Sequence, residues 1–105
     1  MGMEPKLSHT AALILHAIDA GYVYGFGVME VTGLPSGTVY PALRRLERDD
    51  LIASEWEPEA IATAELRPLR KYYRVTKAGG EALAGAHRRY PLLTRMIPAD
   101  KAVSA

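Results

Sequence analysis

The sequence predicts a winged helix-turn-helix: a mostly helical domain with a small β-hairpin, in the order helix, helix, helix, strand, strand, helix. Three observations predict it. Two short helical apolar patterns, at about residues 25–32 and 36–49, are separated by Gly33. Two stretches rich in β-branched and aromatic residues, 51–57 and 69–75, then flank a long loop with a proline near each end. A last helical pattern, for which Thr76 is a suitable N-cap, runs from about residue 77 to 90 and stops at Pro91.

The first two helices are bounded by small residues. Ser8 is a suitable N-cap for the first helix, and Gly21 is its natural stop. The second helix is short, from about residue 25 to 32. Its glycines, Gly25 and Gly27, each weaken a helix by about 1 kcal/mol relative to alanine. We therefore expect them at close backbone contacts.

The third helix contains a proline, Pro41, which removes a backbone donor. If Ser36 is the N-cap, the lost bond is the one to the Gly37 carbonyl, near the frayed start of the helix. The position is equally compatible with a bend in a surface helix and with a ring that fixes an exposed, ligand-facing turn. Apolar residues form the buried stripe of this helix, and tyrosine and arginine lie on or beside the opposite face: Tyr40, Arg44, Arg45 and Arg48.

The composition favours one domain, which we place at residues 1–90, followed by a short, partly flexible tail at 91–105. The chain has 105 residues, of which 49% are apolar, and no cysteine. The N-terminal region has no signal-peptide pattern, and its apolar run at 11–15 is far too short to span a bilayer. We therefore expect a cytoplasmic protein that does not enter a membrane.

The sequence carries no pattern of an enzyme or a metal site. It has no GxSxG motif, no phosphate-binding loop and no paired carboxylates in an apolar setting. The three histidines, His9, His16 and His87, are not spaced as metal ligands. We expect no catalytic activity, no cofactor and no metal.

The third helix has the composition of a DNA recognition helix. In a helix-turn-helix, the N-terminal residues of the second helix of the pair face the bases in the major groove. Small residues there allow close approach, hydroxyls bind phosphates or base edges, and guanidinium groups one turn later bind phosphate or guanine. The candidate residues are Ser36, Thr38, Tyr40, Pro41, Arg44 and Arg45. The expected partner is double-stranded DNA, although solvated charge on a helix face is the simpler reading of the arginines alone.

Two motifs in this order resemble the PadR-like family of bacterial transcriptional regulators. They are SGTVYPALRRLERDDLIASEWE and, after a gap, RPLRKYYRVTKAGGEAL. The resemblance extends from about residue 7 to 83. It implies a winged-helix homodimer that binds a pseudo-palindromic operator, usually as a repressor. It also implies DNA contacts from Ser36, Thr38, Tyr40, Pro41 and Arg44, and from wing residues Arg70, Lys71, Tyr72 and Tyr73.

The sequence departs from the family pattern in three places. Asp50 stands where the family usually has glycine, at the turn from recognition helix to wing; aspartate tolerates φ > 0 less well than glycine. The wing loop, 58–68, is acidic and apolar, so its basic contacts are confined to Arg67, Arg70 and Lys71. Longer members of the family append a helical dimerisation domain, and only a short stretch follows the last helix here.

Strand alternation places Arg70, Tyr72 and Arg74 on one face of the second strand, and Lys71, Tyr73 and Val75 on the other. Tyr73 and Val75 are expected to face the core. Trp56 is expected to pack in the core or at the base of the wing. The wing residues expected to contact DNA are Arg67, Arg70, Lys71 and Tyr72.

The first and last helices carry apolar residues beyond one core stripe, which predicts a dimer interface. The residues are Leu13, Ile14, Ala17, Leu83, Ala86, Tyr90 and Leu93. One broad core stripe is the alternative, and the family resemblance favours the dimer.

Two further hypotheses remain open. The acidic N-terminal half, with eight Asp/Glu against four Lys/Arg in residues 1–57, fits a winged-helix protein-interaction module that does not bind DNA. The second hypothesis is a small-molecule effector of unknown identity that lodges between the helices of a dimer, against Tyr22, Tyr24, Phe26 and Trp56. Core packing accounts for these aromatic residues equally well.

Overall fold

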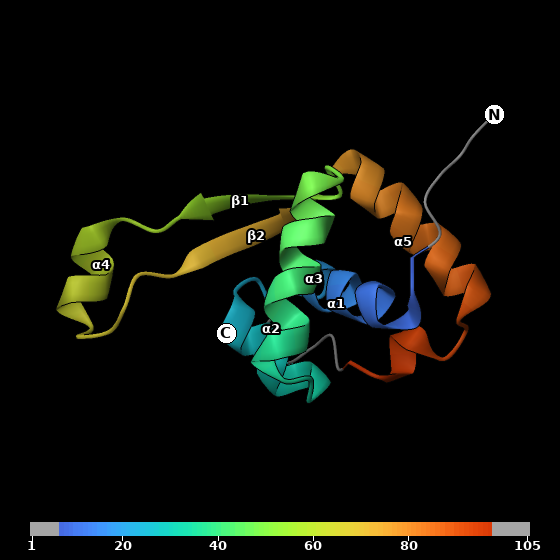
Figure 1. The fold of residues 1–105 in the computed structure, drawn as a ribbon, viewed down its shortest axis with the longest axis horizontal. Coiled ribbons are helices and arrows are strands. Elements are labelled where there is room, and N and C mark those ends of the chain that lie inside the picture. The colour runs from blue at the N-terminus through green and yellow to red at the C-terminus, as the bar shows by residue number, and fades with distance from the viewer. Residues whose placement is uncertain (1–6, 98–105) are drawn as a thin grey trace.

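In a computed structural model, residues 7–97 are described; the last part of the predicted tail, 98–105, lies outside the described residues. The elements, in chain order, are α1 (His9–Asp19), α2 (Gly25–Thr32), α3 (Ser36–Arg48), β1 (Ile52–Trp56), α4 (Glu59–Ala64), β2 (Lys71–Val75), α5 (Lys77–Arg89) and the 3-10 helix η1 (Leu93–Arg95). Figure 1 shows α3 in front of α1, with the hairpin projecting to one side and α5 on the other. The winged helix-turn-helix prediction is confirmed, with α2 and α3 as the helix pair.

The predicted caps hold the helices in place. The Ser8 hydroxyl accepts a hydrogen bond of 3.0 Å from the Ala11 amide at the start of α1, and Thr76 does the same for Gly79 at the start of α5. Each satisfies one of the amides that a helix start leaves unpaired. Helix α2 ends at Thr32, and its C-cap Gly33 has φ of 74°, a conformation that glycine adopts more readily than other residues.

Helix α1 is the centre of the core, and this overturns part of the predicted dimer interface. Six of the seven residues expected there are buried within the single chain: Leu13, Ile14, Ala17, Leu83, Ala86 and Leu93. Tyr90 is half-buried, and its hydroxyl donates to the Leu7 carbonyl at 3.1 Å. The reason is that α2, α3, α5, β2 and η1 all pack against α1, so a chain of this size uses nearly all of that helix as core.

The core continues past the boundary predicted at residue 90. Leu93, in η1, is 0% exposed, and Ile97 is 2% exposed. Both belong to the same apolar cluster as α1. Residues 91–97 are therefore part of the domain, because these two side chains fill the end of the core that α5 leaves open.

The hairpin is antiparallel, with Ile52 opposite Val75 and Trp56 opposite Lys71. Its connection is not a plain loop as predicted, because residues 59–64 form helix α4. Pro58 is the N-cap of α4, and the next residue, Glu59, lies in the first turn, where a carboxylate favours a helix. An alanine-rich stretch of six residues was too short to show a helical period.

Asp50 adopts the left-handed conformation suggested by its place in the family pattern, with φ of 63°. Its carbonyl accepts a 2.7 Å hydrogen bond from the Thr76 hydroxyl. The turn from α3 to β1 is thereby tied to the start of α5, which fixes where the wing leaves the body. None of the helices that the structure describes is both long and apolar enough to cross a membrane.

Candidate nucleic-acid interface

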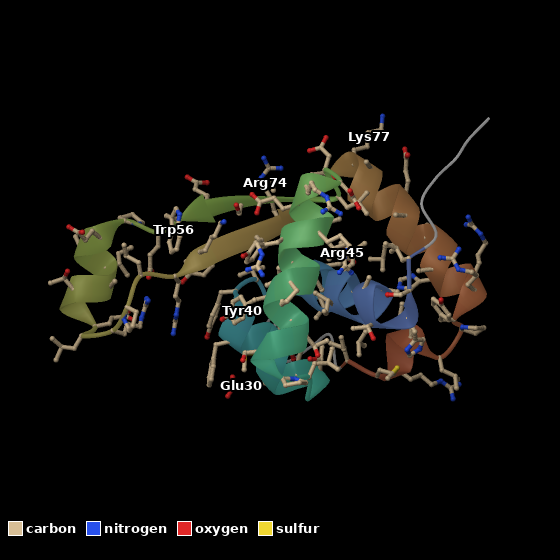
Figure 2. All side chains as sticks on the ribbon, viewed as in Figure 1. Glu30, Tyr40, Arg45, Trp56, Arg74 and Lys77 are labelled. Carbon is tan, nitrogen blue, oxygen red and sulfur yellow. The ribbon has the colours of Figure 1, made fainter. Side chains whose placement is uncertain are left out.

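Helix α3 presents the predicted recognition surface. Ser36, Tyr40, Arg44 and Arg45 are exposed, whereas Thr38 and Pro41 are half-buried. Figure 2 shows Tyr40 and Arg45 on this helix, in front of the body of the domain. Among the ion pairs of the described residues, none involves Arg44 or Arg45, so both guanidinium groups are available to an anionic ligand.

The start of α3 differs by one residue from the prediction. Pro35 is the N-cap, and Ser36 is the first helical residue. Pro41 is thus one position deeper in the helix than expected, and it cannot donate to the carbonyl of Gly37. Gly37 is exposed, so water can reach that carbonyl, and the helix continues without interruption to Arg48.

Tyr40 is positioned by the second helix of the motif. A Cβ added to Gly25, at the start of α2, would lie 2.5 Å from the Tyr40 ring and hydroxyl. Glycine at position 25 therefore allows the Tyr40 ring to lie directly on the backbone of α2. This is the close backbone contact expected for a glycine that weakens the helix. The contact holds the phenol at the exposed edge of the helix pair.

A carboxylate on α3 connects the recognition helix to the wing. Glu47 accepts a hydrogen bond of 2.5 Å from the Ser54 hydroxyl in β1, and its other oxygen lies 3.6 Å from the Lys71 ammonium in β2. These contacts fix the angle between helix and hairpin. Neither Glu47 nor Ser54 was singled out from the sequence, because the pairing depends on the distance between two elements.

The aromatic residues of β2 pack against the segment before α2. The Arg70 guanidinium lies 4.2 Å from the centroid of the Tyr24 ring, and the Tyr72 ring meets the same ring edge to face at 5.8 Å. A hydrogen bond to Tyr72 raises the pKa of Arg70. Tyr73 is buried, as predicted, and burial raises the pKa of its hydroxyl. Because they pack against Tyr24, Arg70 and Tyr72 are half-buried, with part of each side chain still accessible.

Arg67 is occupied inside the wing, which contradicts its predicted availability to DNA. Its guanidinium makes two hydrogen bonds to the Glu57 carboxylate, the second at 3.0 Å, and one of 2.8 Å to Glu65. Glu57 also accepts a 2.7 Å hydrogen bond from the Arg70 amide, and its side chain is only 3% exposed. A buried carboxylate requires such partners. Arg67 thus supports the wing from inside.

Trp56 also differs from its prediction. It is 60% exposed, near the end of β1, and the Lys71 ammonium lies 5.7 Å from the ring centroid. Helix α4 is the reason, because it extends the hairpin and carries the end of β1 away from the body (Figure 1). An aromatic ring at this place can contact a bound ligand.

A groove of about 660 Å³ lies between α3, the start of α2 and the wing. Three of the four aromatic residues considered for an effector line it, namely Tyr24, Phe26 and Trp56, whereas Tyr22 packs against the core. Arg44 and Lys71 line the same groove from opposite sides. Cations on two walls and exposed aromatic faces suit a phosphodiester backbone better than an uncharged ligand.

We expect the tip of the wing to loosen in acid. The hydrogen bonds from Arg67, more than any other contact, hold the pKa of Glu57 below its ordinary value. The stability that this provides is complete above the ordinary glutamate pKa and is lost as the pH falls through the lowered one. Trp56, the only tryptophan, adjoins Glu57, so its fluorescence emission should report the change.

The variant Arg67→Ala tests this expectation. Its Trp56 emission spectrum at neutral pH should already be that of the loosened wing tip, because the Glu57 carboxylate would lack its main partner. An acid transition that is identical in Arg67→Ala and in the original protein would contradict the role of this ion pair.

The histidines form no metal site among the described residues, where no three His, Cys, Asp or Glu side chains cluster. His16 and His87 instead meet between α1 and α5, with ring nitrogens 3.2 Å apart. Burial, followed by the nearby His87, lowers the pKa of His16. The pair therefore acts in packing two core helices together.

A recognition helix with free arginines, packed against a helix and a β-hairpin wing, defines the class of winged helix-turn-helix transcriptional regulators. The profile of the PadR-like family of transcriptional regulators matches residues 14–85. The chain belongs to this family of transcriptional regulators. A comparison with curated proteins finds no match.

Solved structures agree with this assignment. A PadR family transcription regulator from Clostridium difficile has a TM-score of 0.69 and 25% identity, covering 84% of this chain and 93% of its own. A PadR-like transcription factor from Bacteroides fragilis has a TM-score of 0.65 and 26% identity, covering 81% of this chain and 82% of its own. Bordetella bronchiseptica BpsR, whose DNA binding is regulated by 6-hydroxynicotinic acid, shares the fold. Its TM-score is 0.62 and its identity 22%, covering 86% of this chain and 64% of its own.

Proposed function

We propose that this protein is a transcriptional repressor that binds a pseudo-palindromic operator in double-stranded DNA as a homodimer. The observation that carries the proposal is the exposed face of α3, where Tyr40, Arg44 and Arg45 lie and where neither arginine forms an ion pair with a carboxylate of the described residues. Free guanidinium groups next to hydroxyl-bearing side chains are suited to phosphates and guanine edges.

In the proposed complex, α3 lies in the major groove and the wing lies along the flanking backbone. Ser36 and Thr38 approach the DNA first, and Arg44 follows two turns along the helix. Lys71 and Arg70 contact phosphates from the wing. The contacts of Glu47 with Ser54 and Lys71 keep Lys71 at a fixed distance from α3. Two such helices, related by a two-fold axis, read half-sites about 34 Å apart.

The dimer interface must use surface that the core leaves free. The buried residues of α1 cannot supply it, so exposed residues elsewhere on the domain must do so. Tyr90 is the one residue of the predicted set that stays partly exposed. A repressor of this type acts by occupying the operator, which needs no catalytic group.

The groove between α3 and the wing is a second binding place within the same proposal. An effector that entered it would contact Tyr24, Phe26 and Trp56 and would meet Arg44 and Lys71. Because these two cations are proposed DNA ligands, such an effector would compete with operator binding. This fits a small-molecule effector, although the groove lies within one chain and not between two.

The test is selection of bound sequences from a random duplex library with the purified protein. The double variant Arg44→Ala, Arg45→Ala is selected in parallel. We expect an inverted repeat to be enriched by the original protein alone, because α3 supplies the base contacts. Enrichment by neither protein, at low salt and micromolar concentration, would favour a winged-helix protein-interaction module. Enrichment by both would remove the two arginines from recognition.

A further inference from the structure

The tip of the wing has features that binding to DNA does not use. Residues 55–66 contain four glutamates and no lysine or arginine. Arg67 pairs with two of the four, which leaves the tip negatively charged. A negative surface is repelled by phosphates, so the tip is not suited to the DNA backbone.

One leucine at this tip is almost fully exposed. Leu66 follows α4, has φ of 54° and is 91% exposed. Its left-handed backbone closes the C-terminus of α4, because the Leu66 amide donates to the Thr63 carbonyl and the Arg67 amide to the Ala62 carbonyl, both at 3.1 Å. These bonds explain the backbone of Leu66, but its exposed side chain gains nothing from burial. Ile61, in α4, is also exposed, at 45%.

We define the wing-tip patch as Glu59, Ile61, Glu65 and Leu66. In Figure 1 it lies at the far end of the hairpin, on α4 and the turn that follows. It combines two exposed glutamates, of which Glu65 is paired with Arg67, with two exposed apolar side chains. A surface of this kind requires a partner that is basic and apolar.

The opposite end of the same molecule has this chemistry. Residues 82–97 contain three arginines and no carboxylate. Arg88, Arg89 and Arg95 are exposed, as are Leu92 at 64% and Met96 at 47%. We define these five residues as the C-terminal patch. No ion pair among the described residues neutralises its arginines.

We propose that the wing-tip patch of one copy docks on the C-terminal patch of a second copy. Carboxylates then meet arginines, and Ile61 and Leu66 meet Leu92 and Met96. Because the two patches differ, the contact is head to tail and can be repeated from copy to copy, unlike the two-fold contact of an operator-bound dimer. Regulators bound at neighbouring sites would associate through it, and the association needs no DNA.

Sedimentation velocity over a range of concentrations, without DNA, measures this association. The protein should form species larger than a dimer at low salt and lose them near 1 M salt, where the Debye length is only about 3 Å. The absence of larger species at low salt and high concentration would overturn the proposal.

The variant Leu66→Gly separates docking from folding. Glycine relieves the left-handed backbone, so the variant should be at least as stable as the original protein, while its association weakens by about tenfold or more. The matched control is Leu69→Ala, which removes an exposed leucine of the wing outside the patch and should not change association. If Leu66→Gly associates normally but loses DNA affinity, the tip is a wedge for DNA and the docking proposal is wrong.

Charge reversal tests which surfaces meet. Glu59→Arg and Arg88→Glu should each weaken association, and the two changes together should restore much of it. If each reversal weakens association but their combination shows no recovery, the wing tip does not face the C-terminal patch.

Discussion

Replacing Gly79 with alanine is expected to lower the free energy of unfolding by about 3 kcal/mol, at the upper end of the usual range for overpacking. Gly79 lies in the first turn of α5, where a Cβ would stand 1.9 Å from the carbonyl oxygen of Leu51 and 2.9 Å from a methyl carbon of Val75. The first contact is with backbone, which cannot rotate away as a side chain can.

The Leu51 backbone is also held on both sides. Its amide donates to the Leu46 carbonyl at 2.9 Å, and its carbonyl accepts from the Thr76 amide at 3.1 Å. Relief of the clash would break one of these hydrogen bonds or shift α5 against the body. The turn from α3 to the wing would move with it, so Gly79→Ala should also weaken DNA binding.

Gly80→Ala is the matched control. A Cβ at Gly80 meets nothing within 4 Å, and the residue is exposed in the same turn of α5. Alanine there should stabilise the helix by roughly 0.5–1 kcal/mol. Urea unfolding of both variants measures the difference, and equal midpoints for Gly79→Ala and Gly80→Ala would contradict the close contact.

The second large effect is expected from Arg44→Ala combined with Lys71→Ala. The pair removes one cation from each side of the groove between α3 and the wing. Loss of Arg44 should weaken specific binding by about 1–3 kcal/mol if it reads a base. Loss of Lys71 should weaken binding to all sequences alike and reduce the salt dependence by about one phosphate contact.

Titration of labelled duplexes at several salt concentrations distinguishes these contributions. The control, Lys77→Ala, removes one positive charge from the exposed start of α5, outside α3 and the wing, and should change affinity little. If the double variant binds as tightly as Lys77→Ala, the DNA does not pass between α3 and the wing, and the docking geometry is wrong.

The local pattern of the sequence was sufficient for the elements whose signals lie within one segment. Ser8 and Thr76 cap helices through atoms three residues away, so their roles depend on short spacing alone. The exposed arginines of α3 follow from helical periodicity, and the buried Tyr73 follows from strand alternation. The order of the main helices and strands could be derived in the same way, whereas the family was indicated by the resemblance of two motifs.

The tertiary structure alone decided how the surfaces are used. The sequence could not show that five other elements pack against α1, which places Leu13 and Ala17 in the core instead of an interface. It could not show that Arg67 meets Glu57, ten residues away, because that pairing depends on how α4 folds back toward the strands. Glu47 likewise acts through Ser54 and Lys71 only once helix and hairpin are packed. Periodicity determines which side of an element faces inward, and the packing of distant elements determines which charges remain free.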